Sequence, residues 1–175
     1  KPYGVSNISS RALNNSERKM WVASVSKQFT GLAIALLVTE NKISLEDDIR
    51  KYLPELPYLG DTVKIKHLIY HTSGLREGFT LTAMSFKSEE EYTNANILKY
   101  LSKQTGRNFR PGDRFEYNNS GYVLLAIIVE RVSNLYFPDF VKQFIFDPLG
   151  MDNSRFFLEF PKNDTSMAVG YAVST

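Results

Sequence analysis

The stretch Trp21–Thr39, WVASVSKQFTGLAIALLVT, is the segment from which the fold and the chemistry of this sequence are best inferred. A short apolar lead-in reaches a polar step at Ser24, and the residues after it predict a long apolar helix. Ser24 and Lys27 are three residues apart, so a helical turn places both side chains on one face. A hydroxyl with an ammonium one turn away is the arrangement that a serine nucleophile requires.

Physical chemistry favours a reactive pair at these positions. A serine hydroxyl is a weak nucleophile until a base takes its proton, and a lysine is such a base only when its pKa falls below about 10.4. The following helix is apolar on nearly every side, so we expect it in the interior, where desolvation favours neutral Lys27. The helix N-terminus also favours an oxyanion at Ser24. The alternative is an N-cap serine followed by a solvated lysine.

Composition limits the class of protein. The 175 residues are enough for one domain with a sizeable core, and 43% hydrophobic and 23% charged residues are ordinary for a globular protein. A net charge of +2 indicates neither a nucleic-acid partner nor an anionic membrane. No cysteine is present and only two histidines are, so we expect no metal site and no cofactor. The longest apolar run, Leu32–Val38, is far shorter than the roughly 20 residues that span a bilayer.

Shorter elements are predicted on both sides of the apolar helix. Residues 1–20 alternate turn formers with apolar positions and predict one or two short strands. Asn41 is expected to cap the helix, and Ser44–Asp47 to open a short helix that Pro54 ends.

The rest of the chain predicts more helices than strands. Up to residue 106 we expect an extended piece at 61–65, a helix at 66–71 stopped by Gly74, a surface loop at 76–87, and a helix opened by the capping box Ser88–Glu91 and ending near Gly106. A turn at Pro111–Gly112 and a polar loop at 115–121 then lead to an apolar helix from Ser120 or Gly121 through Val132. The last elements expected are a helix at 137–144, a turn at 147–151, and a loop with the start of a strand at 161–175.

Five segments in one order carry a family resemblance. They are ASVSKQFT at 23–30, NKISLEDDIRKYLPELP at 41–57, VKIKHLIYHTSGL at 63–75, FEYNNSGYVLLAIIVERVS at 115–133 and FIFDPLGMDNSRF at 144–156. With them the sequence resembles the serine β-lactamase and penicillin-recognising family, on the branch of class C β-lactamases, D-alanyl-D-alanine carboxypeptidases and related esterases. The resemblance covers roughly residues 20–172. It implies an α+β fold of the β-lactamase/transpeptidase type, with residues 1–175 forming a single partial domain: the helical subdomain, the nucleophile helix and an incomplete antiparallel sheet.

The same resemblance implies roles for four residues. Ser24 matches the acylated nucleophile, Lys27 its partner lysine, Tyr117 the general base or proton relay, and Asn119 the asparagine that holds the amide side of the substrate. A phenol accepts a serine proton at neutral pH only when cationic neighbours stabilise the phenolate, and Lys27 is such a neighbour. The alternatives are a Tyr117 that only packs and an Asn119 that only caps the helix. His71 is left out of the catalytic set, because the motif around it resembles a structural one.

The third motif of the family, K-T-G or H-x-G, has no counterpart in the expected place. Lys103–Gly106 and His71–Gly74 look similar, but each has an extra residue and stands too early in the chain. We therefore expect this motif beyond residue 175 and an N-terminus inside an early strand. We also expect the parent protein to be active and the piece alone to be inactive and poorly stable.

Three functions follow from this sequence. The first is a serine hydrolase that forms an acyl-enzyme with a small-molecule or peptide-like substrate and attacks an amide, β-lactam or ester carbonyl. The second is a catalytically inactive, penicillin-binding-like ligand-binding module, and the third is a helical module without a ligand. The resemblance also implies export to the periplasm, the cell surface or the medium.

Overall fold

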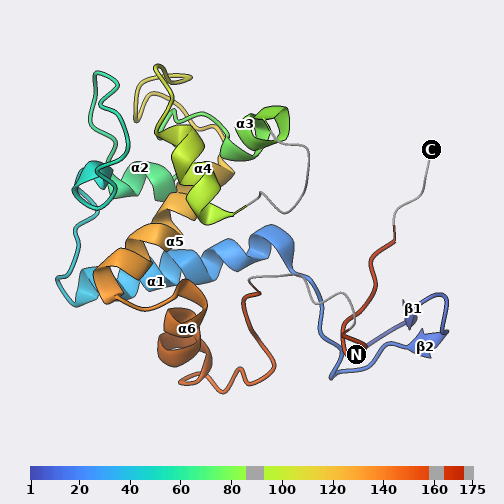
Figure 1. Cartoon of the computed structure of the whole chain (residues 1–175). Helices are drawn as coiled ribbons and strands as arrows, with labels where there is room; N and C mark the ends of the chain where they lie inside the picture. The colour runs from blue at the N-terminus through green and yellow to red at the C-terminus, as the bar shows by residue number, and fades with distance from the viewer. Residues whose placement is uncertain (86–92, 158–163, 172–175) are drawn as a thin grey trace.

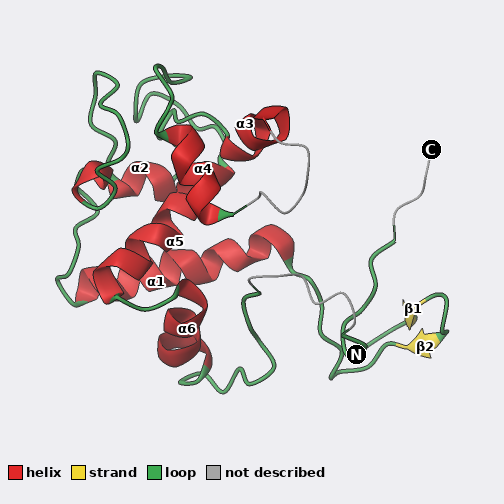
Figure 2. Ribbon diagram, in the orientation of Figure 1, coloured by secondary structure: helices red, strands yellow, loops and turns green. Residues whose placement is uncertain are grey.

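The computed structural model describes residues 1–85, 93–157 and 164–171, and most of them belong to a helical body with a small β-hairpin beside it (Figures 1 and 2). The hairpin pairs β1 (Val5–Asn7) with β2 (Ala12–Leu13) in antiparallel fashion. The last described segment lies against it, and the Val169 N–H donates to the Ser6 carbonyl at 2.8 Å. The short strands predicted in residues 1–20 are confirmed.

The apolar helix begins later than predicted. A 3-10 turn, η1 (Ala23–Ser26), holds Ser24, and the α-helix proper, α1, runs over Lys27–Thr39. Asn41 has a left-handed φ of 56° just past the helix, consistent with its predicted role in ending the helix. The prediction of an all-round interior helix is wrong, because Ala33, Ile34 and Leu37 are buried whereas Leu32 is 42% exposed. Only one side of α1 faces the core.

Helix α5 (Asn119–Ser133) is the central element of the helical body. Its residues from Leu124 to Val129 are all buried. It packs against α1, α2 (Ile65–Ile69), α4 (Asn94–Leu101) and α6 (Phe137–Val141) (Figure 2). Asn118 caps it by accepting a hydrogen bond from the Gly121 N–H at 2.9 Å. The predicted apolar helix is therefore confirmed, although it begins one residue earlier than expected.

The predicted helix at 137–144 is also confirmed. It consists of α6 (Phe137–Val141), which continues directly into a π-helical turn, η4 (Lys142–Phe146). Phe140 and Ile145 are buried, so both parts cover the same core.

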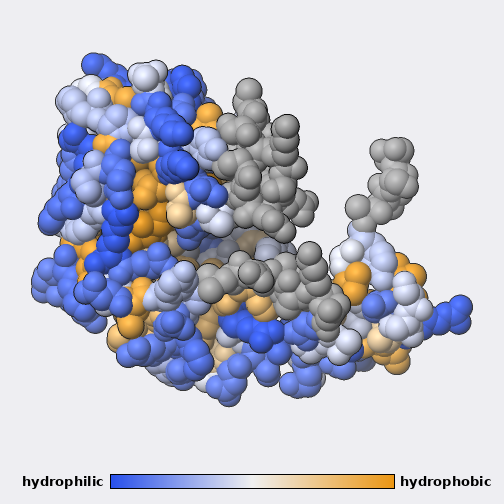
Figure 3. All heavy atoms as spheres, in the orientation of Figure 1, coloured by the Kyte–Doolittle hydropathy of each residue, from blue (hydrophilic) through white to orange (hydrophobic). Residues whose placement is uncertain are grey.

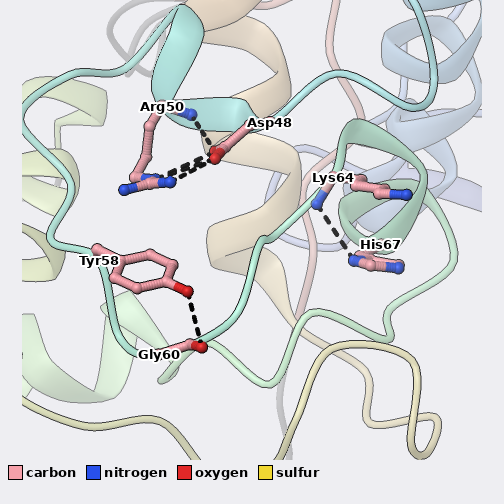
Figure 4. A network of polar contacts seen from close by, with 6 residues as sticks. All are labelled: Asp48, Arg50, Tyr58, Gly60, Lys64 and His67. Carbon is pink, nitrogen blue, oxygen red and sulfur yellow. Dashed lines mark hydrogen bonds and ion pairs between the residues drawn. The ribbon is translucent and has the colours of Figure 1, made fainter.

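The helix predicted to open at Ser44 is a turn instead. The Ser44 N–H donates to the Asp47 carboxylate at 2.9 Å, which closes the turn before a helix can form. A short 3-10 helix, η2 (Ile49–Lys51), follows, and the Asp48 carboxylate caps it by accepting from the Arg50 N–H at 2.9 Å (Figure 4). Side-chain bonds that compete with helix formation explain the difference.

Helix α2 (Ile65–Ile69) ends earlier than the sequence predicts. Tyr70 caps it, and His71 then takes a left-handed φ of 55°. Gly74, the predicted stop, is also left-handed at φ 69°, but it belongs to the turn beyond. The extended piece before α2 forms an antiparallel bridge between Asp48 and Lys64.

The loop predicted at 76–87 is wrong in its described part, which contains helix α3 (Gly78–Ser85). Glu77 helps to start it, because its carboxylate accepts from the Phe79 N–H at 3.3 Å. The capping box Ser88–Glu91 lies outside the described residues. Helix α4 (Asn94–Leu101) begins after Thr93, whose hydroxyl accepts from the Asn96 N–H, and it ends before the predicted stop near Gly106.

Candidate active site

The reactive pair lies at the junction of η1 and α1. Ser24 is in the 3-10 turn and Lys27 is the first residue of α1, so their three-residue spacing brings both side chains together. The Lys27 ammonium donates to Ser24 Oγ at 3.1 Å. The local contact predicted from the sequence is present in the structure.

Tyr117 reaches the same oxygen from a distant part of the chain. It lies in the loop that precedes α5, and its hydroxyl donates to Ser24 Oγ at 2.8 Å. Lys27 Nζ also lies 5.0 Å from the centre of the Tyr117 ring. The Lys27 amine and the Tyr117 phenol therefore both contact the oxygen of the Ser24 hydroxyl.

Asn119 completes the group from the first turn of α5. Its Oδ1 accepts from Lys27 Nζ at 2.9 Å, so the ammonium bridges Asn119 and Ser24. The alternative role of helix N-cap is taken by Asn118, which leaves the Asn119 side chain for Lys27. The structure brings all four predicted residues together.

The electrostatics of the group make the Tyr117 phenol more acidic. Lys27, through hydrogen bonding and its charge, and the hydrogen bond with Ser24 lower the pKa of Tyr117 below its usual value near 10. Desolvation and the Glu77 carboxylate oppose this shift, but the two hydrogen bonds are the largest causes and set its direction. Loss of the phenol proton reverses the short contact, so that the Ser24 hydroxyl donates to the Tyr117 oxygen.

The group is open to solvent. Ser24 is exposed, Tyr117 is 47% exposed and Lys27 is half-buried. The water-poor surroundings expected for Lys27 are therefore not seen among the described residues. Exposed apolar side chains flank the nucleophile at Trp21 and Val25. On the face drawn in Figure 3, hydrophobic patches lie among the mostly hydrophilic residues of the helical body.

Glu77 and His71 also contact this group and were not assigned to it from the sequence. The Glu77 carboxylate accepts from the Asn119 N–H at 2.7 Å, at the start of α5. The His71 ring lies 4.6 Å from the Tyr117 ring, and its Nδ1 accepts from the Asn118 N–H at 3.1 Å. The sequence contained no signal for Glu77, which stands in a segment predicted to be a loop.

Within residues 1–85, 93–157 and 164–171, no three histidine, aspartate or glutamate side chains are placed to share a metal ion. In the same described ranges, no helix is long and apolar enough to cross a bilayer.

Comparison with protein families gives a match over nearly the whole chain. The model of the family described as Beta-lactamase matches residues 1–172.

Individual relatives agree with this match. Penicillin-binding protein 4* of Bacillus subtilis (strain 168) is 38% identical over 135 residues, which cover 77% of this chain and 30% of the relative. The octameric penicillin-binding protein homologue from Pyrococcus abyssi superposes with a TM-score of 0.84 at 31% identity, over 98% of this chain and 40% of that one. A D-amino acid amidase from Ochrobactrum anthropi gives a TM-score of 0.72 at 27% identity, over 84% and 40%. The chain spans about a third of the length of the curated relatives it matches.

Proposed function

This chain belongs to the Beta-lactamase family, and from that membership we propose that it carries the acylation residues of a serine hydrolase. The observation that supports this most directly is the convergence of Lys27 Nζ and the Tyr117 hydroxyl on Ser24 Oγ, at 3.1 and 2.8 Å. A nucleophile within hydrogen-bond reach of its base, with a third group orienting them, is the pattern of covalent catalysis. Asn119 is that third group for Lys27.

The proposed reaction begins with proton transfer. The Tyr117 phenolate, stabilised by Lys27, takes the Ser24 proton, and Ser24 Oγ forms a bond to the substrate carbonyl carbon. The bond to the leaving nitrogen or oxygen then breaks, and the leaving group takes the proton from Tyr117. Water then gives a proton to the same phenolate and attacks the acyl carbon, the bond from that carbon to Ser24 Oγ breaks, and Ser24 Oγ takes the proton back from Tyr117. We propose that Asn119 orients the amide side of the substrate, through the donor and acceptor of its side chain.

The substrate class is an amide, a β-lactam or an ester carbonyl. The relatives include proteins named for penicillin binding and a D-amino acid amidase, and these names support a substrate with a β-lactam or amide carbonyl. Besides the N-terminus of the nucleophile helix, we propose a second hydrogen-bond donor to the oxyanion of the reaction. As the resemblance implies, it is a backbone N–H in a K-T-G or H-x-G motif outside residues 1–175. Loss of one such donor costs on the order of 10²–10³ in rate.

The test is burst acylation of the full-length gene product that contains these residues. We expect a 4-nitrophenyl ester or a fluorescent penicillin to give a burst stoichiometric with protein, and Ser24→Ala to abolish it. A folded wild-type protein that gives no burst with the ester and none with the penicillin contradicts the proposal.

The second candidate is an inactive ligand-binding module. The solvent exposure of Ser24 and Tyr117 favours it, because acylation usually takes place where water is excluded. Reversible binding of penicillin that is unchanged in Ser24→Ala, with no covalent adduct, supports this candidate over the hydrolase.

We also propose export from the cytoplasm, on the family resemblance. Cell fractionation tests this proposal: protein in the envelope or the medium supports it, and protein confined to the cytosol contradicts it.

A further inference from the structure

His71 makes three contacts with one short segment of chain, Glu116–Tyr117–Asn118. Its carbonyl accepts from the Glu116 N–H at 2.9 Å, and its Nδ1 accepts from the Asn118 N–H at 3.1 Å. Its ring lies 4.6 Å from the ring of Tyr117 at an interplanar angle of 32°. One residue thus holds the backbone on both sides of Tyr117 and also the face of its ring.

His71 is itself held by the helical body. It follows α2 with a left-handed φ of 55°, and its N–H donates to the Leu68 carbonyl at 3.3 Å. On the α5 side its ring lies 5.1 Å from Tyr122, whose hydroxyl donates to the Ile69 carbonyl at 3.1 Å. The packed helices α2 and α5 therefore hold His71 from two sides.

From this geometry we propose that His71 is a positioning residue, which holds Tyr117 where its hydroxyl reaches Ser24 Oγ. The inference rests on the proposed function, in which Tyr117 is the base. His71 does not act as that base itself, because its Nδ1 is occupied by the Asn118 N–H.

The contact from Asn118 requires a neutral imidazole. A ring nitrogen that accepts a hydrogen bond carries no proton, and an imidazolium has no acceptor. Burial lowers the pKa of His71, and the Lys27 ammonium acts in the same direction, while the Glu77 carboxylate opposes it. Tyr117 and Tyr122 are the other titratable groups against the ring, and both phenols are neutral below their own pKa values.

The other histidine provides a matched control. His67 Nδ1 accepts a backbone N–H in the same way, from Lys64 at 3.2 Å (Figure 4). Burial lowers the pKa of His67 as well, and its ring is also partly buried. His67 lies in α2 itself, whereas His71 lies in the turn after α2 that contacts Tyr117. The same substitution at the two histidines therefore separates loss of a buried imidazole from loss of the Tyr117 contact.

Four variants of the full-length protein test the proposal: His71→Ala, His71→Asn, His67→Ala and His67→Asn. Asparagine keeps a side-chain oxygen as acceptor and tolerates a left-handed backbone, but it lacks the ring. Two quantities are measured: the acylation rate with a 4-nitrophenyl ester, and the titration of Tyr117 by NMR of tyrosine labelled with ¹³C at Cζ.

We expect His71→Ala to lower the acylation rate by about 10²-fold, the effect of misplacing a reacting group by about 1 Å. The Tyr117 pKa should rise toward about 10, because the phenol moves away from Lys27. His71→Asn should recover part of the acylation rate and part of the lowering of the Tyr117 pKa. The two His67 variants should match the wild type in both quantities.

A folded His71→Ala protein with the wild-type rate and the wild-type Tyr117 titration overturns the proposal, and so does an equal loss in His67→Ala. If His71→Ala does not fold, His71→Asn decides in the same way. A wild type without acylation overturns the proposed function instead, and the Tyr117 titration then decides the role of His71 alone.

Discussion

At the scale of single residues, Ser24 Oγ is where two distant parts of the chain meet. Lys27 reaches it from the next helical turn, whereas Tyr117 stands 93 residues further along the chain. The first contact follows from local geometry and the second from the packing of α1 on α5. The two contacts therefore respond differently to mutation, since any change in helix packing acts on Tyr117 first.

Removal of the Tyr117 hydroxyl should slow acylation without unfolding the protein. Tyr117→Phe keeps the ring against His71 but removes the proton acceptor, so we expect a loss of about 10²–10⁴ in the acylation rate. Stopped-flow kinetics with an activated ester measures it. Tyr136→Phe, at an exposed tyrosine before α6, is the matched control and should keep the wild-type rate. A wild-type rate in Tyr117→Phe contradicts the role of the phenol.

The pH dependence follows from the direction of the Tyr117 shift. Because Lys27 lowers the pKa of Tyr117, the phenolate forms below the usual pH of about 10, and acylation should rise with pH through that lowered value. Lys27→Met removes the ammonium, so the Tyr117 titration should move up toward about 10. NMR of labelled tyrosine measures both proteins. Lys142→Met, at a surface lysine paired with Asp147, should titrate as the wild type does, and an unmoved titration in Lys27→Met contradicts the ammonium as the cause of the shift.

The sequence predicted the residues of the site more readily than the residues that contact and position them. Ser24 and Lys27 follow from a local spacing, and Tyr117 and Asn119 from their place in a resembling segment. Glu77 was missed, because its contact with the Asn119 N–H spans 42 residues and leaves no local pattern. The sequence analysis leaves His71 out of the catalytic set, and its contacts with the Tyr117 segment depend on how α2 and α5 pack.

At the scale of elements, the turn after α2 lies directly against the backbone at Asn108 and Phe109. Gly74 has a φ of 69°, and a Cβ at this position would lie 2.0 Å from the Phe109 carbonyl oxygen. The Gly74 carbonyl also accepts from the Asn108 N–H at 2.8 Å. The two backbones approach so closely that only glycine fits.

Gly74→Ala should therefore be strongly destabilising, and Gly150→Ala is its matched control. Gly150 has a similar φ of 64°, but a Cβ there meets no atom within 4 Å. We expect Gly150→Ala to lose only the left-handed strain, about 1–2 kcal/mol, and Gly74→Ala to lose clearly more. Urea unfolding of the full-length variants measures the difference. Equal losses contradict the close approach to Phe109.

The elements that the sequence predicted well are those with strong periodicity or clear caps. The apolar helices α1 and α5 have such signals, whereas the eight residues of α3 have no clear period and predict a loop. The start of α3 depends on Glu77 and on a hydrogen bond from the Gly78 N–H to the Ser120 hydroxyl. The bond to Ser120 is a long-range contact, and such contacts stabilise a helix that its own sequence does not indicate.

At the scale of the whole molecule, the buried stretch of α5 holds the helical body together. Leu124 is fully buried between helices, so Leu124→Ala should cost about 2–5 kcal/mol of unfolding free energy. Leu149→Ala, at a side chain that is 64% exposed, makes the same chemical change and should cost little. Denaturant titration of both variants measures this. Equal costs contradict the central position assigned to α5.

The α+β fold was predictable because several resembling segments occur in one order, and the solved relatives agree with it. The sheet is represented among the described residues by two short strands, as expected for an incomplete sheet. The surroundings of Ser24 were predicted less well. An apolar sequence indicates burial only where other parts of the fold cover it, and α1 is covered on one side.

The site of covalent modification tests most directly whether Lys27 and Tyr117 activate Ser24. The full-length protein is treated with a fluorophosphonate and digested, and the modified peptide is sequenced by mass spectrometry. We expect one adduct, on Ser24, formed faster than on any other serine and suppressed in Tyr117→Phe. A protein that remains unmodified, or that is modified elsewhere while Ser24 stays free, contradicts the activation of Ser24 by these two residues.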